Sequence, residues 1–231
     1  MPPGRTKADA LFTRLRGDIL TGALQPGQRL RYGQLCEHYG TSMGVLRETL
    51  VRLAELGLVR GEQQQGFQVT PLSAADLREL TDTREEIEGL AVRRAITDGD
   101  VTWESELLAA HHRLERTPVT GGDGEAADPP QVSEDWAEAH ACFHHTLLDG
   151  CDNRRLKTYA ASLRDAAEVY RRWAFTVGHD QDRDIAAEHA AILEAALQRD
   201  ADLAVALLRA HIRRTTTTLL AAMERQWPDQ A

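Results

Sequence analysis

One stretch decides the fold of this chain: Thr41-Ser-Met-Gly-Val-Leu-Arg-Glu-Thr-Leu-Val-Arg-Leu-Ala-Glu-Leu-Gly57. It predicts a helix, because Thr41 or Ser42 offers a hydroxyl that caps the free N–H groups of the first turn. Gly57 tolerates the left-handed conformation that commonly follows a helix end. At about 100° per residue, one side of the helix collects a mostly apolar set: Ser42, Val45, Leu46, Thr49, Leu53 and Leu56.

The opposite side of this helix carries Met43, Gly44, Arg47 and Val51. A helix packed only for stability has little need of an arginine near the start of its outer face. A helix that enters the major groove of DNA with its N-terminal end does need one, because arginine reads base edges and phosphates. We therefore interpret residues 41–57 as a recognition helix that is controlled by everything after residue 72.

The residues around the recognition helix complete a small domain. Before it, the sequence predicts a helix over residues 8–21 and a short helix at about residues 34–39. After it, two strands are predicted at residues 58–60 and 67–70, joined by a polar loop. Three helices and a β-hairpin make a winged helix-turn-helix, to which we assign residues 1–72 as the DNA-binding domain.

Charge is divided unevenly along the 231 residues. The chain carries 27 Lys/Arg and 36 Asp/Glu, and a uniform net charge of −9 would disfavour nucleic acid. Residues 1–72, however, hold nine basic and six acidic side chains, a net of +3, whereas the remainder holds 18 and 30, a net of −12. A basic head on an acidic body is typical of a protein whose first domain alone meets phosphate.

Composition favours a cytoplasmic protein. Hydrophobic residues make 42% of the chain and aromatic residues 5%, which is typical of a soluble and mostly helical protein. No apolar run approaches the roughly 18 residues that span a bilayer, and the N-terminus lacks the apolar core of a secretory signal, so we expect no membrane partner. The odd number of cysteines, Cys36, Cys142 and Cys151, favours a reducing compartment.

Beyond a short hinge at residues 71–73, only helical patterns remain. A start resembling a capping box at Ser73 opens a long helix to about Thr97. Further helices are expected over residues 102–116, 133–149, 153–175, 182–199 and 201–226, with a loop at 117–130. The predicted fold class is therefore mainly α: a winged helix-turn-helix followed by an antiparallel all-α bundle of about six helices at residues 73–231.

Three motifs in the first domain carry a family signature. They are Ile19-Leu-x-Gly22-x-Leu24-x-Pro26-Gly27-x-x-Leu30, Arg47-Glu48-x-Leu50-x-x-Leu53-x-x-x-Gly57-Leu58-Val59 and Gly66-x-x-Val69. This part of the chain resembles the GntR family of bacterial transcription regulators. The resemblance implies that Arg47 contacts a base or a phosphate and that the wing tip enters the minor groove. The residues that we accordingly expect to contact DNA are Ser42, Met43, Gly44, Arg47, Gln65 and Gly66.

Two of these positions depart from the family pattern. Position 43 is usually basic and position 65 is often Arg or His, whereas this chain has Met43 and Gln65. The amide of Gln65 still donates to minor-groove acceptors but adds no charge. We therefore expect an operator that differs from the commonest half-site, bound with a weaker dependence on salt. In the alternative interpretation, Met43 only packs against thymine methyl groups or the neighbouring helix.

Four histidines fall on core-facing stripes of three predicted helices. His140 and His144 stand four residues apart, the spacing that lets two imidazoles reach one metal ion. His189 and His211 share their faces with apolar residues on two later helices. Because buried imidazoles are costly without partners, a shared divalent cation would satisfy all four. His145 lies about 100° around the helix from His144, so it is not expected to be a ligand.

The second domain also carries a family signature, in the motifs Phe143-His144-x-x-Leu147, Asn153-x-x-Leu156, Glu188-His189-x-x-Ile192-Leu193-x-Ala195 and Ala204-x6-His211-Ile212. It resembles the FCD domain, the ligand-binding domain of the FadR-like branch of the GntR regulators. The resemblance implies a metal held by one acidic residue and three histidines, and it implies dimerisation and effector binding by this domain. His144, His189 and His211 match the family histidines, while His140 occupies the position that is usually Asp.

Two arrangements follow from that replacement. Either all four histidines bind the ion, or His140 swings aside and leaves three imidazoles with more open coordination positions. Both suit Zn²⁺ or Ni²⁺, because neutral imidazoles bind these ions better than Mg²⁺ or Ca²⁺. Both also suit a small carboxylate effector that completes the coordination shell. Arg84, in the motif Arg84-x-x-Ile87-Glu88, either clamps that carboxylate or forms an ion pair with Glu88, its i+4 neighbour.

Together these features predict a ligand-responsive transcription regulator, not an enzyme. It would bind a palindromic operator as a homodimer, and a small carboxylate at the metal pocket would modulate it, with repression as the expected outcome. One alternative keeps DNA binding but makes the metal site purely structural. Another is a metal-dependent enzyme, in which Glu188 would have to act as general base although its helix position points it away from His189.

Overall fold

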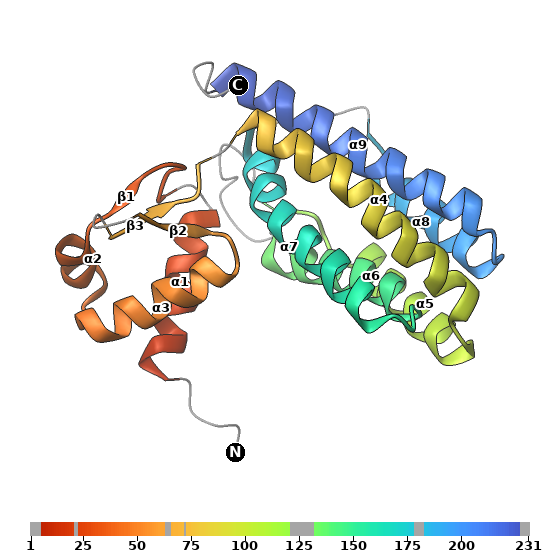
Figure 1. Cartoon of the computed structure of the whole chain (residues 1–231), viewed down its shortest axis with the longest axis horizontal. Helices are drawn as coiled ribbons and strands as arrows, with labels where there is room; N and C mark the ends of the chain where they lie inside the picture. The colour runs from red at the N-terminus through yellow and green to blue at the C-terminus, as the bar shows by residue number, and fades with distance from the viewer. Residues whose placement is uncertain are drawn as a thin grey trace. The chain divides into compact units, whose positions relative to one another are not determined.

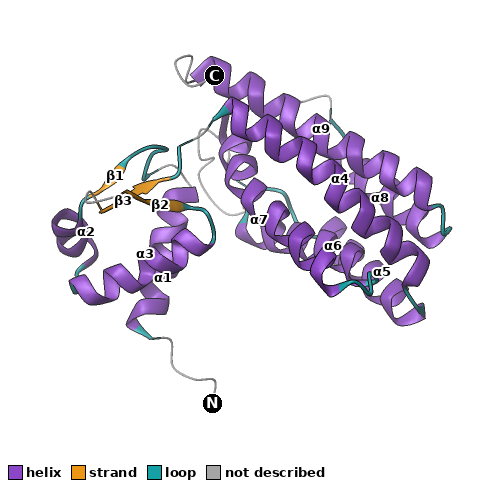
Figure 2. Ribbon diagram, viewed as in Figure 1, coloured by secondary structure: helices purple, strands orange, loops and turns teal. Residues whose placement is uncertain are grey.

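A computed structural model of the chain describes residues 6–20, 23–62, 66–71, 73–120, 132–177 and 183–226 (Figure 1). The chain divides into two compact units, Met1–Ser73 and Ala74–Ala231. In the described residues, the first unit combines helices with a small sheet, and every named element of the second is a helix (Figure 2).

The helices of the first unit form a winged helix-turn-helix with its sheet. Helix α1 (Lys7–Leu20) packs against α3 (Met43–Glu55), and the short helix α2 (Tyr32–Tyr39) packs on α3 as well. Gly40 adopts the left-handed conformation (φ 61°) that turns the chain from α2 towards α3. The turn is sharp because glycine has no Cβ to oppose this φ.

The sheet of this unit has three antiparallel strands. Strand β3 (Gly66–Val69) lies between β1 (Arg29–Leu30) and β2 (Val59–Glu62). The register pairs Gly61 with Phe67 across the hairpin of β2 and β3. This hairpin is the wing.

Helix α3 buries a slightly different stripe from the predicted one. Leu46, Leu50 and Leu53 are fully buried, and Thr49 is buried with them. The prediction omitted Leu50, and it was wrong for Leu56, which is 40% exposed. The cause is the end of the helix at Glu55, since Leu56 no longer follows the helical rotation.

Two other details of the first unit differ from the prediction. Helix α2 begins at Tyr32 instead of residue 34, and Arg31 before it makes no side-chain cap. Strand β1 has no counterpart in the prediction, because it is two residues long and is defined only by its pairing with Gln68 and Phe67. Such a short strand leaves no periodic pattern in the sequence.

The second unit is an all-α bundle. Its helices in the described residues are α4 (Ala74–Asp98), α5 (Val101–Arg116), α6 (Glu134–Asp149), α7 (Arg154–Val177), α8 (Ile185–Leu197) and α9 (Ala201–Gln226). Helix α4 runs beside α9 (Figure 1) and also packs on α7, while α5 packs on α6 and α8 on α9. The six predicted helices correspond to these six. Most of the predicted loop at 117–130 lies outside the described residues.

The core of this unit fixes the helix that carries two of the histidines. Phe143 and Leu107 are fully buried between α6 and α5. The indole of Trp103 donates a hydrogen bond to the backbone oxygen of Thr146 at 2.8 Å. Because aromatic anchors of this kind bury large apolar area, they hold α6 in one rotation about its axis.

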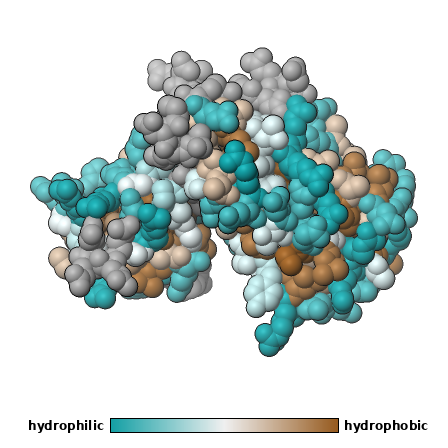
Figure 3. All heavy atoms as spheres, turned by 45° about the horizontal axis from the view of Figure 1, so that its top comes forward, coloured by the Kyte–Doolittle hydropathy of each residue, from teal (hydrophilic) through white to brown (hydrophobic). Residues whose placement is uncertain are grey.

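Exposed apolar side chains are scattered over the described residues. On the face shown in Figure 3, hydrophilic side chains predominate and apolar ones appear in separate patches. The more exposed apolar side chains include Val101 (73%) and Met43 (62%). No helix among the described residues is long and apolar enough to cross a membrane.

Candidate functional site

The start of α3 exposes a short row of side chains. Met43 is 62% exposed, and Ser42, Gly44 and Arg47 are exposed as well. The Ser42 hydroxyl accepts from the backbone N–H of Val45 at 3.5 Å, so Ser42 is the N-cap of the helix. The side chain of Arg47 makes no hydrogen bond or ion pair with the described residues. This end of the helix therefore presents a cation that none of the described residues pairs with.

A second arginine on the same helix has a structural role. Arg52 pairs with Asp9 of α1 at 2.9 Å, and its guanidinium lies 4.4 Å from the centroid of the Phe12 ring. These contacts tie α3 to α1. They also distinguish Arg52 from Arg47, whose side chain points to solvent.

The wing requires glycine at position 66. Gly66 has φ +90°, and a Cβ there would lie 3.4 Å from the ring of Tyr32. A side chain at this position would therefore strain the backbone of the hairpin. Gln65, the other residue expected at the wing tip, lies outside the described residues.

The four predicted histidines come together inside the second unit. His140 and His144 lie on α6, His189 on α8 and His211 on α9. His140, His144 and His189 are each 2% exposed, and His211 is 7% exposed. One ring nitrogen of each lies within 4.8 Å of those of the others, and the Nε2 atoms of His144 and His189 are 3.2 Å apart. Three helices thus direct four imidazoles at one point.

This spacing fits a single cation. Zn–N bonds are about 2.0–2.1 Å long, so adjacent ligand atoms lie about 2.9–3.4 Å apart and opposite corners of an octahedron about 4.1 Å apart. The 3.2 Å separation of His144 and His189 falls in the range for adjacent ligands. The widest spacing, up to 4.8 Å, needs only small ring rotations to close on one ion. Neutral nitrogen donors without a carboxylate among them suit zinc or nickel.

Burial holds the cluster in the neutral state that metal binding requires. Loss of solvation lowers the pKa of His140 and His144 well below the usual value, and neighbouring arginines and histidines lower it further. Burial, with the charge of His211, lowers the pKa of His189 to about 2. The pKa of His211 is lowered as well, by burial. At neutral pH a cation would therefore not have to displace protons from the cluster.

Glu188 supports the cluster from outside. Its carboxylate oxygen Oε2 lies 2.7 Å from Nδ1 of His211 and 2.7 Å from Nη2 of Arg183. Burial raises the pKa of Glu188, but the hydrogen bonds from His211 and Arg183 outweigh it and hold the pKa at about 2. A carboxylate bound to Nδ1 leaves Nε2 of His211 free to face a metal. In the sequence, Glu188 is related only to its neighbour His189, and nothing there indicates its contact with His211 of another helix.

Arg84 forms the ion pair that one of the two predictions described. Its Nε atom lies 2.5 Å from Oε1 of Glu88, and both side chains are buried. Arg84 also lines a small cavity beside His211. The charge of Arg84 is thus compensated within the helix, although its side chain borders the histidine cluster.

Two arginines of α7 lie beside the same cavity, and the sequence analysis did not single them out. Arg164 is 3% exposed, and its Nη2 atom lies 3.4 Å from both Nδ1 and the backbone oxygen of His140. Burial lowers the pKa of Arg164 to about 10, so it is still charged at neutral pH. Arg171 follows about two turns later on the same helix and also lines the cavity. Because Arg84 pairs with Glu88 and Arg171 pairs with Glu168, the positive charge that remains beside the histidines is that of Arg164.

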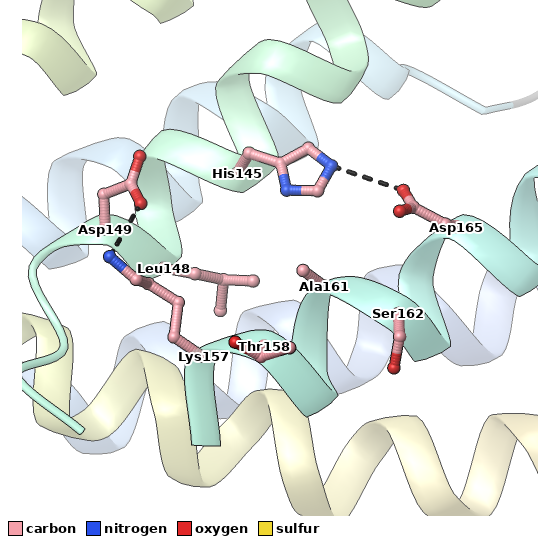
Figure 4. Close-up of a pocket in the computed structure, with 8 residues that line it drawn as sticks. All are labelled: His145, Leu148, Asp149, Lys157, Thr158, Ala161, Ser162 and Asp165. Atoms are coloured by element: carbon pink, nitrogen blue, oxygen red, sulfur yellow. Dashed lines mark ion pairs between the residues drawn. The ribbon is translucent and has the colours of Figure 1, made fainter. Parts of the chain in front are cut away.

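His145 points away from the cluster. Figure 4 shows it in a surface cleft between α6 and α7, where its Nε2 atom lies 3.4 Å from Asp165. Across the same cleft Lys157 pairs with Asp149 at 3.2 Å. His145 is thus not among the grouped histidines, in agreement with its predicted position on the helix.

The cluster also borders a second cleft. His189 and the half-buried His111 line a space of about 350 Å³ with mostly apolar neighbours, among them Leu114, Trp136 and Ile185. The ring of His111 meets Phe143 edge-on at a centroid distance of 5.5 Å. A ligand of small-molecule size would find room here, next to His189 and to apolar surface.

Both units match known families. The profile of the bacterial regulatory proteins of the gntR family matches residues 7–69, and the profile of the FCD domain matches residues 79–214. Among curated proteins, the uncharacterized HTH-type transcriptional regulator BphR of Paraburkholderia xenovorans is 36% identical over 213 residues, which cover 90% of this chain and 83% of BphR.

A second relative carries the name of a repressor. HTH-type transcriptional repressor GlaR of Escherichia coli is 31% identical over 204 residues, covering 86% of this chain and 89% of GlaR. Among solved structures, E. coli McbR/YncC superposes with a TM-score of 0.69 at 19% identity, covering 94% of this chain and 98% of that one. At this identity the superposition supports the fold alone.

Proposed function

Because the chain belongs to the gntR family of bacterial regulatory proteins and carries an FCD domain, we propose that it is a repressor whose DNA binding responds to a small carboxylate. By family it is a regulator of transcription and not an enzyme. The observation that carries the proposal is the convergence of four buried imidazoles in the unit that follows the winged helix.

For DNA binding we assign the reading role to the start of α3. Arg47 would contact a base edge or a phosphate, with Ser42, Met43 and Gly44 beside it in the major groove. Gly66 and Gln65 would follow the minor groove from the wing. The exposure of the α3 row and the unused charge of Arg47 support this assignment. A homodimer would place two such helices on the two halves of a palindrome.

For effector binding we assign the metal to His140, His144, His189 and His211. Once bound, Zn²⁺ or Ni²⁺ would supply a Lewis acid to which a carboxylate oxygen binds. Glu188 orients His211, and Arg84, held by its ion pair with Glu88, lines the cavity from α4. Burial keeps the four imidazoles neutral and excludes bulk water from the ligand.

Helix α4 is the element that would transmit the signal. It begins one residue after the first unit ends, and Leu77 in its first turns lines the cavity beside His211. Its start is tied to α7 by the hydroxyl of Tyr170, which donates to Asp76 at 2.5 Å. A 2.6 Å hydrogen bond joins Thr81 to Thr216 of α9. An effector that favours one arrangement of α7 and α9 would therefore move the start of α4.

The experiment is a mobility-shift assay with the DNA upstream of the protein's own gene and excess nonspecific competitor. Wild-type protein should retard this DNA, and Arg47→Ala should weaken the affinity about tenfold or more. Arg78→Ala, which removes the same charge from an exposed position on α4, is the matched control and should bind as wild type. Equal affinity of the Arg47→Ala and wild-type proteins would refute the assigned role of α3.

The oligomeric state is tested separately. Sedimentation equilibrium should give about twice the chain mass of 25.6 kDa. A mass of one chain, for protein that still binds the palindromic DNA tightly, would contradict the dimer.

A further inference from the structure

Arg164 is a buried cation without a matching anion. It is 3% exposed, and its nearest hydrogen-bond contacts are the two 3.4 Å contacts of Nη2 with His140. Its Nε atom is buried and has no hydrogen-bond partner. Withdrawing a guanidinium from water without pairing it is unfavourable, so such a group is retained where a ligand completes it.

The acidic groups around Arg164 are already used by other side chains. Glu88 is paired with Arg84 at 2.5 Å, and Glu188 is paired with Arg183 and His211. Asp165, next to Arg164 in the chain, faces His145 in the outer cleft between α6 and α7 (Figure 4). Among the side chains that the structure describes, none places a carboxylate in hydrogen-bond contact with Arg164.

The guanidinium faces a small cavity. Arg164 lines the cavity beside His211 together with Arg84, Arg171, Thr215 and Thr216. Its volume is about 20 Å³, room for one water molecule, so a carboxylate group would need the lining side chains to move apart. The other Arg164 contact, the ring of His140, belongs to the histidine cluster. A planar group in this cavity would therefore meet both the arginine and the edge of the cluster.

We propose that Arg164, and not Arg84, is the principal anchor for an anionic ligand, and that the group it binds is a carboxylate. The proposal rests on the proposed function only in identifying this anion with the effector. Arg164 offers the planar fork of donors that matches a carboxylate. Arg84, whose charge is satisfied by Glu88, serves to position the wall of the cavity.

The test uses zinc-loaded full-length protein and measures thermal unfolding with acetate, malonate and citrate as probes. Acetamide and malonamide are the neutral controls. In wild type, at least one of the carboxylates should raise the unfolding temperature in a saturable way, and the amides should not. Arg164→Gln should weaken that response tenfold or more, while Arg94→Gln, at an exposed position on α4, should keep it.

Two further measurements separate anion binding from a purely structural role. Without any anion, Arg164→Gln should unfold at a temperature equal to or above that of wild type, because a buried unpaired charge has been removed. Arg164→Lys, which keeps the positive charge but lacks the planar fork of donors, should also weaken the response to carboxylates. This second variant answers the question if Arg164→Gln does not fold.

The proposal would be overturned by a wild type that responds equally to acids and amides or to neither. It would also be overturned by Arg164→Gln and Arg164→Lys proteins that respond like wild type. The same preparations are assayed for retardation of the upstream DNA without anion. DNA binding without a carboxylate response contradicts only the role of Arg164, whereas a carboxylate response without DNA binding contradicts only the proposed function.

Discussion

Zinc should stabilise the metal-free protein, and this effect should depend on His144 but not on its neighbour His145. The perturbation is the His144→Ala substitution, which removes the imidazole whose Nε2 atom lies 3.2 Å from that of His189. The matched control is His145→Ala, one residue away, where the side chain faces Asp165 in the outer cleft (Figure 4).

The magnitude follows from linkage between binding and folding. A ligand present at 100 times its dissociation constant stabilises the native state by about 2.7 kcal/mol. For a unit of the size of Ala74–Ala231, each kcal/mol raises the unfolding temperature by about 2–4 °C. Zinc at that concentration should therefore raise the unfolding temperature of the wild type and of His145→Ala by about 5–11 °C.

Calorimetry of chelator-treated protein with stepwise zinc addition measures this shift, and elemental analysis of the same samples gives the metal content. The His144→Ala protein should lose most of the shift and should retain less zinc after dialysis, because one of the four donor atoms is absent. A His144→Ala protein with the same zinc content and the same shift as His145→Ala would refute the metal site.

Three other outcomes are expected. Burial holds the pKa values of the four histidines below those of the unfolded chain, so the metal-free protein should have its full stability only above about pH 6.5. Below that pH, the free energy of unfolding should fall by up to about 1.4 kcal/mol per buried imidazole and pH unit. Urea midpoints that are equal at pH 7.5 and 5.5 would contradict this. In urea unfolding, Arg84→Met should destabilise the protein by about 3–5 kcal/mol, because Glu88 is left buried and unpaired. The Arg84→Met/Glu88→Met double variant should recover most of this loss. Equal destabilisation of the two variants would argue against the ion pair. Tyr170→Phe should still bind the carboxylate, but the bound carboxylate should change the DNA affinity less than in wild type, because the hydrogen bond to Asp76 is lost. Fluorescence anisotropy measures the DNA affinity. An undiminished change would exclude a role of this hydrogen bond in transmitting the signal.

The periodic features of the chain were predictable from sequence. The six helices of the second unit follow from apolar spacing, and the grouping of His144 with His189 and His211 follows from their placement on core-facing stripes and from the family resemblance. The winged helix-turn-helix followed in the same way from the stretch at residues 41–57 and the strands after it.

What could not be predicted depends on contacts between distant elements. Arg164 lies in a helix rich in arginine, and nothing in its local pattern distinguishes a buried guanidinium from an exposed one. The contact of Glu188 with His211 depends on the packing of α8 against α9, which spacing along the chain does not specify. Strand β1 exists only through its pairing with β3.

The proposed coupling between the metal pocket and DNA binding is measured by the affinity of the zinc-loaded full chain for its own upstream DNA across a panel of small carboxylates. For wild type, at least one carboxylate should change the affinity about fivefold or more, which is the coupling expected between two linked sites. The His189→Ala protein should still bind the DNA but should show no such change. Absence of DNA binding by the wild type, or an unchanged response in the His189→Ala protein, would contradict the account.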